Sequence, residues 1–262
     1  MVMKIIFSGG EADNNRLEAY DGLKSVDGLI RVARIATHYA ATNEVRFRAP
    51  YTDVLSMQLI ASHPGSFEMV FDNIAQAMDS NSAQRVKAIS AALIQRLMRR
   101  GTGQADGDSL VVDGETIPSG DIDAMAEASE AGLKAAHRWI DTANKKITLS
   151  NSRGATELDT STREYVETEV DGGETTKDVS VAALNVNSRN GRVYFNDENR
   201  TVPFVVHRDA EARTMPNLSK YLNEYARKTG AQVNIRYRQI DHIDGRTKRI
   251  VIYDCYDVAD AA

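Results

Sequence analysis

The chain has 262 residues, of which 42% are hydrophobic and 26% charged, and its formal net charge is -5. This composition is typical of a soluble globular protein with room for two domains of roughly 100 residues each. No stretch approaches the roughly 18 consecutive apolar residues of a membrane helix, and the N-terminus lacks a secretion-signal pattern, so we expect a cytoplasmic protein without a membrane partner.

The first hundred residues predict an alternation of strands and helices. A short apolar run at residues 4–7 predicts an opening strand. Apolar residues at three- and four-residue spacing predict helices over 22–41 and 73–100. Between them, period-two patterns and a proline- and glycine-containing loop at 63–66 predict two or three strands. We therefore expect an α+β domain in which the helices cover one face of a sheet, as a sandwich-like layer.

The middle of the chain predicts a tight hairpin and then a long helix. Asp113-Gly114 stands between short apolar segments, which indicates a two-residue turn. Residues 121–146 follow with a narrow apolar seam on one helix face; its members are Ile122, Met125, Ser129, Leu133, Ala136, Ile140 and Ala143. Such a seam can pack inside the fold or against a second copy in a homo-oligomer.

Residues 150–180 carry 8 acidic and 3 basic residues, so we expect an exposed linker or a polar hairpin there, with Gly172-Gly173 as the turn of an edge strand. The predicted organisation is an α+β domain over 1–149, this acidic segment, and a strand-rich domain with one helix over 181–262. The last domain is expected to form a partly open barrel or a small sheet.

The candidate site lies in the final hairpin, where arginines alternate with apolar and aromatic residues. A two-residue turn at Asp244-Gly245 would place Arg236 opposite Tyr253, Arg238 opposite Val251 and Ile240 opposite Arg249. Arginine beside an aromatic ring can bind phosphate and stack a base. With a second cluster in SRNGRVYF, the predicted nucleic-acid-binding residues are Arg192, Tyr194, Arg236, Arg238, Arg249 and Tyr253.

An ordinary solvated strand explains the same pattern, because arginines commonly protect exposed edges from pairing with other chains. Asp241, Asp244 and Asp254 are close enough in the sequence to cancel part of the charge. Residues 187–249 hold 13 basic and 7 acidic residues, and this net charge of +6 is too small for a dedicated duplex-binding protein. A nucleotide, which carries fewer charges than nucleic acid, fits equally well.

No catalytic, metal-binding or cofactor-binding motif is present, so we expect no cofactor and assign no catalytic residue. The five histidines are scattered, and GTGQAD has only two of the glycines of a dinucleotide-binding loop. The single cysteine excludes an internal disulfide, and the apolar neighbours of Cys255 favour a buried thiol. A metal-dependent nuclease would have to use His242, Asp254, Asp257 and Lys248.

Several short segments, SGGEAD at 8–13, RAPYTD at 48–53, HPGSFEMVFD at 63–72 and PFVVHRD at 203–209, resemble a family of uncharacterised bacterial proteins of about this length. The resemblance implies a bacterial or mobile-element protein, within an antiphage defence system, and assigns no activity to any residue.

Three hypotheses follow from the sequence. The first is a non-enzymatic protein that binds nucleic acid or a nucleotide through the predicted residues. The second is an interaction subunit of a larger complex, whose protein partner contacts the helix seam and the acidic segment. The third is the metal-dependent nuclease.

Overall fold

The computed structural model describes residues 2–52, 55–59, 67–75, 78–104, 110–198 and 200–257. The chain forms two compact units, Met1–Glu167 and Thr168–Ala262, here called the N-terminal and C-terminal units. The expected α+β class is confirmed, with five α-helices and most strands of the C-terminal half in one barrel within the described ranges. The predicted loop at 63–66 and the last two residues of GTGQAD, Ala105 and Asp106, lie outside the described residues.

A five-stranded antiparallel sheet organises the N-terminal unit. Its strands, in the order in which they are hydrogen-bonded, are β2 (Leu55–Leu59), β3 (Phe67–Ala75), β1 (Val2–Ser8), β6 (Lys146–Asn151) and β7 (Gly154–Leu158). In β1, the buried residues Met3, Ile5 and Phe7 alternate with exposed or half-buried ones. Because side chains alternate between the two faces of a strand, one face of this sheet lies against the core.

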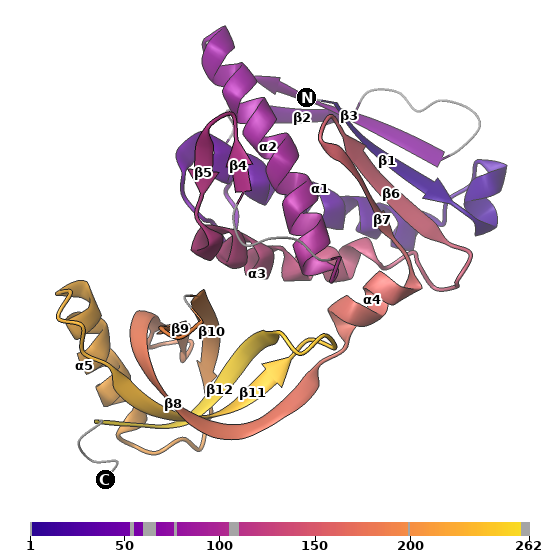
Figure 1. Ribbon diagram of the computed structural model, residues 1–262. Helices are drawn as coiled ribbons and strands as arrows, with labels where there is room; N and C mark the ends of the chain where they lie inside the picture. The colour runs from indigo at the N-terminus through magenta and orange to yellow at the C-terminus, as the bar shows by residue number, and fades with distance from the viewer. Residues whose placement is uncertain are drawn as a thin grey trace. The chain divides into compact units, whose positions relative to one another are not determined.

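Three helices pack against one another in this unit (Figure 1): α1 (Ala19–Thr42), α2 (Ser80–Gly101) and α3 (Ser119–Ala136). Helix α2 also contacts β7 of the sheet. Helices α1 and α3 approach closely, since a Cβ atom added at Gly28 would lie 2.3 Å from the carbonyl oxygen of Gly132. The smaller elements of the unit are η1 (Gly10–Asn14), β4 (Leu110–Val112), β5 (Glu115–Ile117) and α4 (Thr160–Glu167). The tight turn between β4 and β5 is confirmed, with positive φ at both Asp113 and Gly114.

The helix boundaries differ from those predicted. Helix α2 begins only at Ser80, because the Asp79 carboxylate accepts the N–H groups of the first turn and residues 73–75 belong to β3. Helix α3 ends at Ala136, ten residues before the predicted end at 146. The apolar spacing continued into residues 137–145 because these residues also pack into the core as a turn, and periodicity alone does not distinguish the two.

The seam on α3 faces the core of its own unit. Ile122, Met125, Ser129, Leu133 and Ala136 are all at most 1% exposed. A partner protein or a second copy cannot reach side chains that are already buried by α1 and α2. The use of this seam as a contact surface between chains is therefore wrong, and its packing inside the fold is confirmed.

The C-terminal unit is a closed five-stranded barrel. Its strands are β8 (Val170–Asn185), β9 (Asn190–Phe195), β10 (Arg200–Val206), β11 (Val233–Asp241) and β12 (Thr247–Asp257). Around the barrel the order is β8-β9-β10-β12-β11, with β10 and β12 parallel and the other neighbours antiparallel. Helix α5 (Thr214–Ala226) joins the third strand of the unit to the fourth and places Leu218 in the core. This is the connectivity of the OB fold.

The acidic segment is folded rather than a linker. Residues 150–180 hold the end of the β6–β7 hairpin, α4 and the first part of β8. The units divide between Glu167 and Thr168, and β8 passes through Gly172-Gly173 without turning. β8 is the long curved strand of Figure 1, and it pairs with both β9 and β11. The sequence could not show this pairing, because local patterns do not indicate which later strands β8 pairs with.

Among the residues that the structure describes, no helix has the length and apolar composition required to cross a membrane.

Candidate nucleic-acid interface

The candidate interface begins on the outward side of β9 and β10. In β9, buried residues alternate with Arg192 and Tyr194, which therefore point away from the barrel core. The same alternation in β10 turns Pro203 and Val205 outward, and Val205 is 43% exposed. The strand register places Arg192 opposite Pro203, so basic, aromatic and apolar groups lie side by side.

β12 and β11 extend this surface. Val205 lies beside Val251 in the parallel pair, and Val251 pairs in turn with Arg238 of β11. The predicted pairs Arg238 with Val251 and Ile240 with Arg249 are confirmed. We call the outward side of β9, β10, β12 and β11 the outer face. The predicted residues lie on this outward side in two groups, with β10 between them: Arg192 and Tyr194 on β9, and Arg236, Arg238, Arg249 and Tyr253 on β11 and β12.

The predicted pairing of Arg236 with Tyr253 is wrong. Arg236 pairs with Asp254 and Tyr237 pairs with Ile252, so Tyr253 is an extra residue in a β-bulge. A bulge has no clear sequence signal in this strand. The contact between the two predicted residues nevertheless forms, because the Arg236 Cζ atom lies 5.8 Å from the centroid of the Tyr253 ring.

The hairpin turn is wider than predicted. The Gly245 N–H donates to the His242 carbonyl at 3.0 Å, and φ is positive at Gly245 but not at Asp244. A two-residue turn of the favoured type would require positive φ at both central residues. Ile243 and Asp244 therefore occupy the centre of the turn, and Gly245 takes the left-handed position that follows it.

Each of the three hairpin arginines of the outer face is paired with a carboxylate from the first residues of the C-terminal unit. These ion pairs are Arg236 with Glu174 at 2.5 Å, Arg238 with Asp171 at 3.2 Å and Arg249 with Glu169 at 2.7 Å. We call Glu169, Asp171 and Glu174 the acidic strip. The hydrogen bond that Arg236 donates to the Glu174 carboxylate raises the pKa of Arg236. Exposed pairs of this kind contribute only about 0–1 kcal/mol each, so a phosphate group can compete for the arginines.

The carboxylates that the sequence suggested as charge partners lie elsewhere. Asp254 accepts two hydrogen bonds from Arg213, at 2.9 and 2.6 Å. Asp244 accepts from Arg246 at 2.8 Å within the turn, and Asp241 is buried. The cancellation of charge was expected from residues of the hairpin itself, but it comes from Glu169 and the first part of β8, more than 60 residues earlier in the chain.

The domain boundary changes the charge of the barrel. Residues 181–262 hold 13 basic and 10 acidic residues, whereas residues 168–262 hold 14 of each, because Lys177 and four carboxylates of 168–180 are added. The net charge of the C-terminal unit is therefore 14 - 14 = 0. A surface without excess positive charge does not favour duplex DNA, which is bound mainly through its phosphates.

Further side chains near the outer face were missed by the sequence analysis. The His207 ring stacks on Tyr253, with centroids 4.7 Å apart and an interplanar angle of 29°. The turn between β8 and β9 exposes Val186 by 61%, and the turn between β11 and β12 exposes Ile243 by 47%. A single valine or isoleucine in a turn does not indicate a binding site in a sequence. Only the barrel fold shows that these two turns flank β9 and β10.

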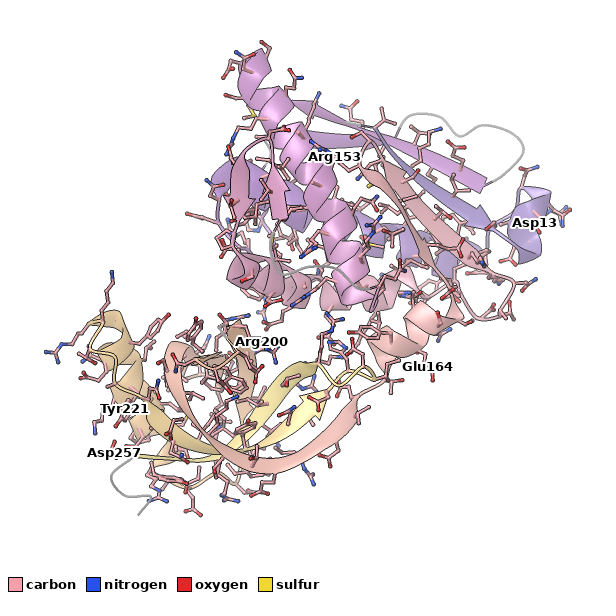
Figure 2. All side chains as sticks on the ribbon, in the orientation of Figure 1. Asp13, Arg153, Glu164, Arg200, Tyr221 and Asp257 are labelled. Carbon is pink, nitrogen blue, oxygen red and sulfur yellow. The ribbon has the colours of Figure 1, made fainter. Side chains whose placement is uncertain are left out.

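The residues of the predicted nuclease do not converge. Arg213 lowers the pKa of Asp254 by hydrogen bonding to its carboxylate. Asp257 accepts from Tyr221 at 2.7 Å, an α5 contact visible in Figure 2, and this bond raises the pKa of Tyr221 to about 12. Lys248 pairs with Glu169. Within the described ranges, no group of three or more histidine, cysteine or acidic side chains is arranged to hold a metal ion.

Cys255 is buried, as predicted. It lies in the barrel core at 0% exposure, and this burial raises the pKa of its thiol to about 12. A thiol with such a pKa remains protonated and unreactive at neutral pH.

Two family models match the chain. Residues 3–107 match a domain of unknown function (DUF7946), and residues 173–255 match a family of unknown function (DUF7947). No curated protein and no solved structure matches the chain. The first match falls within the N-terminal unit, and the second covers most of the barrel, including the outer face. Two parts of the chain are thus similar to families of unknown function, which confirms the resemblance to an uncharacterised protein family.

Proposed function

We propose that the C-terminal unit binds single-stranded nucleic acid, without catalysis, on the outer face of β9 and β10. The observation that carries this proposal is the position of Arg192, Tyr194 and Val205 on these two strands of a closed barrel with OB connectivity. In OB folds, the second and third strands form the face that binds oligonucleotides, and the loops after the first and fourth strands flank it. β9 and β10 are the second and third strands here.

The flanking loops support the same location. The loop after β8 carries Val186 and the loop after β11 carries Ile243, and both side chains are exposed. The first loop also contacts the end of β10, because the Val206 N–H donates to the Arg189 carbonyl at 2.8 Å. Apolar side chains on both loops would cover bases that stack on the strands between them.

Single strands fit the chemistry better than duplexes do. Tyr194 offers an aromatic ring for stacking, and an exposed base can reach it only when it is not paired in a double helix. The neutral barrel provides few excess cations for a duplex backbone. Arg192 would bind phosphate beside the stacked base. A role in bacterial antiphage defence or in a mobile element remains part of this proposal through the sequence resemblance alone.

The test is fluorescence-anisotropy binding of a labelled single-stranded oligonucleotide to the full chain. Because each stacked base contributes about 1–3 kcal/mol, Tyr194→Ala is expected to weaken binding roughly tenfold. Tyr225→Ala is the matched control, since Tyr225 is an exposed tyrosine of the same unit on α5.

The control is expected to bind as the unchanged chain does, and a duplex of the same sequence is expected to bind more weakly. Absence of binding at low salt, or equal losses in the two tyrosine variants, would contradict the proposal.

A further inference from the structure

The N-terminal unit has a basic surface that the sequence analysis did not use. Between residues 31 and 52 the chain contains four arginines, Arg31, Arg34, Arg46 and Arg48, and one acidic residue, Glu44. None of the four arginines forms an ion pair with any residue in the part of the chain that the structure describes. They differ in this respect from Arg236, Arg238 and Arg249, which the acidic strip neutralises.

Arg46 and Arg48 lie in the loop that follows α1, on either side of Phe47. The period-two pattern of VRFRAP was compatible with a third strand there, but residues 43–52 form no strand. Arg46 and Arg48 are exposed and Phe47 is 39% exposed, so a ring and two guanidinium groups reach solvent from three consecutive residues.

This loop is fixed at both ends. At its start, the Asn43 N–H donates to the Tyr39 carbonyl at 2.7 Å and closes α1. At its end, the Thr52 N–H donates to Nδ1 of His38 at 3.0 Å, and Tyr51 is only 9% exposed. The anchored ends reduce the conformational entropy that the exposed residues would lose on binding.

One neighbouring arginine adds to the positive surface. The Arg34 Cζ atom lies 5.4 Å from the centroid of the Tyr51 ring, which holds this arginine beside the anchored end of the loop. Burial, together with the nearby charge of Arg46, lowers the pKa of His38. His38 Nδ1 also accepts the Thr52 N–H, as a neutral ring does, so the positive charge of this surface comes from the arginines.

We propose that Arg34, Arg46, Phe47 and Arg48 form a second binding site for single-stranded nucleic acid, in the N-terminal unit. The arginines would contact successive phosphates, and Phe47 would stack on a base between them. An exposed phenyl ring between two arginines favours a strand with unpaired bases over an anion that carries charge alone. This site goes beyond the proposed function of the barrel, because it shares no residue with the outer face.

The test counts bound oligonucleotides by native mass spectrometry of the full chain with a strand of about six nucleotides, which is short enough to occupy one site. The unchanged chain is expected to bind two copies. Arg46→Glu with Arg48→Glu is expected to bind one, with the affinity for the lost copy reduced at least tenfold. Arg16→Glu with Arg99→Glu is the control and is expected to bind two, because these arginines are also exposed and unpaired within the described residues.

An abasic strand of the same length tests the stacking. Phe47→Ala is expected to lower the affinity for the second copy of the normal strand and to leave binding of the abasic strand unchanged. Two bound copies in the Arg46 and Arg48 variant, or loss of a copy in the control, would overturn the inference. One copy that depends on Arg46 and Arg48 but not on Tyr194 would support this site and contradict the barrel site, and the reverse dependence would do the opposite.

Discussion

Replacing Trp139 with alanine is expected to lower the free energy of unfolding of the N-terminal unit by about 3–5 kcal/mol, the usual cost of removing a large buried aromatic ring. Trp139 is 1% exposed and meets Phe7 of β1 edge-on, with ring centroids 5.1 Å apart. Its Nε1–H donates to Glu11 at 2.7 Å, and Lys145 Nζ lies 4.8 Å from the ring centroid. The Trp139 side chain therefore packs the turn after α3 against β1 and bonds it to η1.

Denaturant unfolding of the full chain, followed by circular dichroism, measures this effect. The transition of the N-terminal unit should move to lower denaturant concentration, while that of the barrel should stay in place. Trp139→Phe is the control, since it keeps a ring against Phe7 and loses only the hydrogen bond to Glu11 and part of the volume. A loss below about 1 kcal/mol in the alanine variant would show that the turn does not depend on Trp139.

Removing the acidic strip is expected to strengthen binding of single-stranded nucleic acid. The variant Glu169→Gln, Asp171→Asn, Glu174→Gln leaves Arg236, Arg238 and Arg249 without their carboxylate partners, as the ion-pair distances indicate. For a single strand, each additional phosphate contact makes the slope of log K against the logarithm of the salt concentration steeper by about 0.7. Three contacts would raise the affinity about 10- to 100-fold near 0.1 M salt.

The control removes the same number of charges from other parts of the barrel. Its substitutions are Asp178→Asn, Glu224→Gln and Asp257→Asn, whose carboxylates contact Asn234, Arg227 and Lys220. The control should raise affinity only slightly, through net charge. Equal gains in both triple variants would mean that the hairpin arginines do not contact the strand, and a loss in the acidic-strip variant would mean that these carboxylates hold the barrel in shape.

The hairpin shows how far sequence reasoning reaches. The alternation from Val233 to Arg238 correctly separated buried from outward residues, because the period of a strand is fixed by its geometry. The register was also correct near the turn, at Arg238 and Ile240. It failed beyond the bulge at Tyr253, since one extra residue shifts every later pair and leaves no mark on the apolar pattern.

The charge of the site could not be predicted for a different reason. The acidic strip was visible as an acidic segment, but its position beside β11 depends on a pairing between residues about 60 to 80 apart in the chain. Composition assigned Glu169, Asp171 and Glu174 to an exposed linker or a polar hairpin, whereas the fold places them against the arginines. Long-range strand pairing is set by the packing of the whole barrel, which local patterns do not contain.

The most direct test of the barrel site is photo-crosslinking of the full chain to a single-stranded oligonucleotide that carries a photoreactive base, with peptides identified by mass spectrometry. We expect crosslinks on β9 and β10, at Tyr194 above all, and on the flanking loops that carry Val186 and Ile243. If the crosslinked peptides of the C-terminal unit came from α5 and not from β9 or β10, the proposed barrel site would be contradicted.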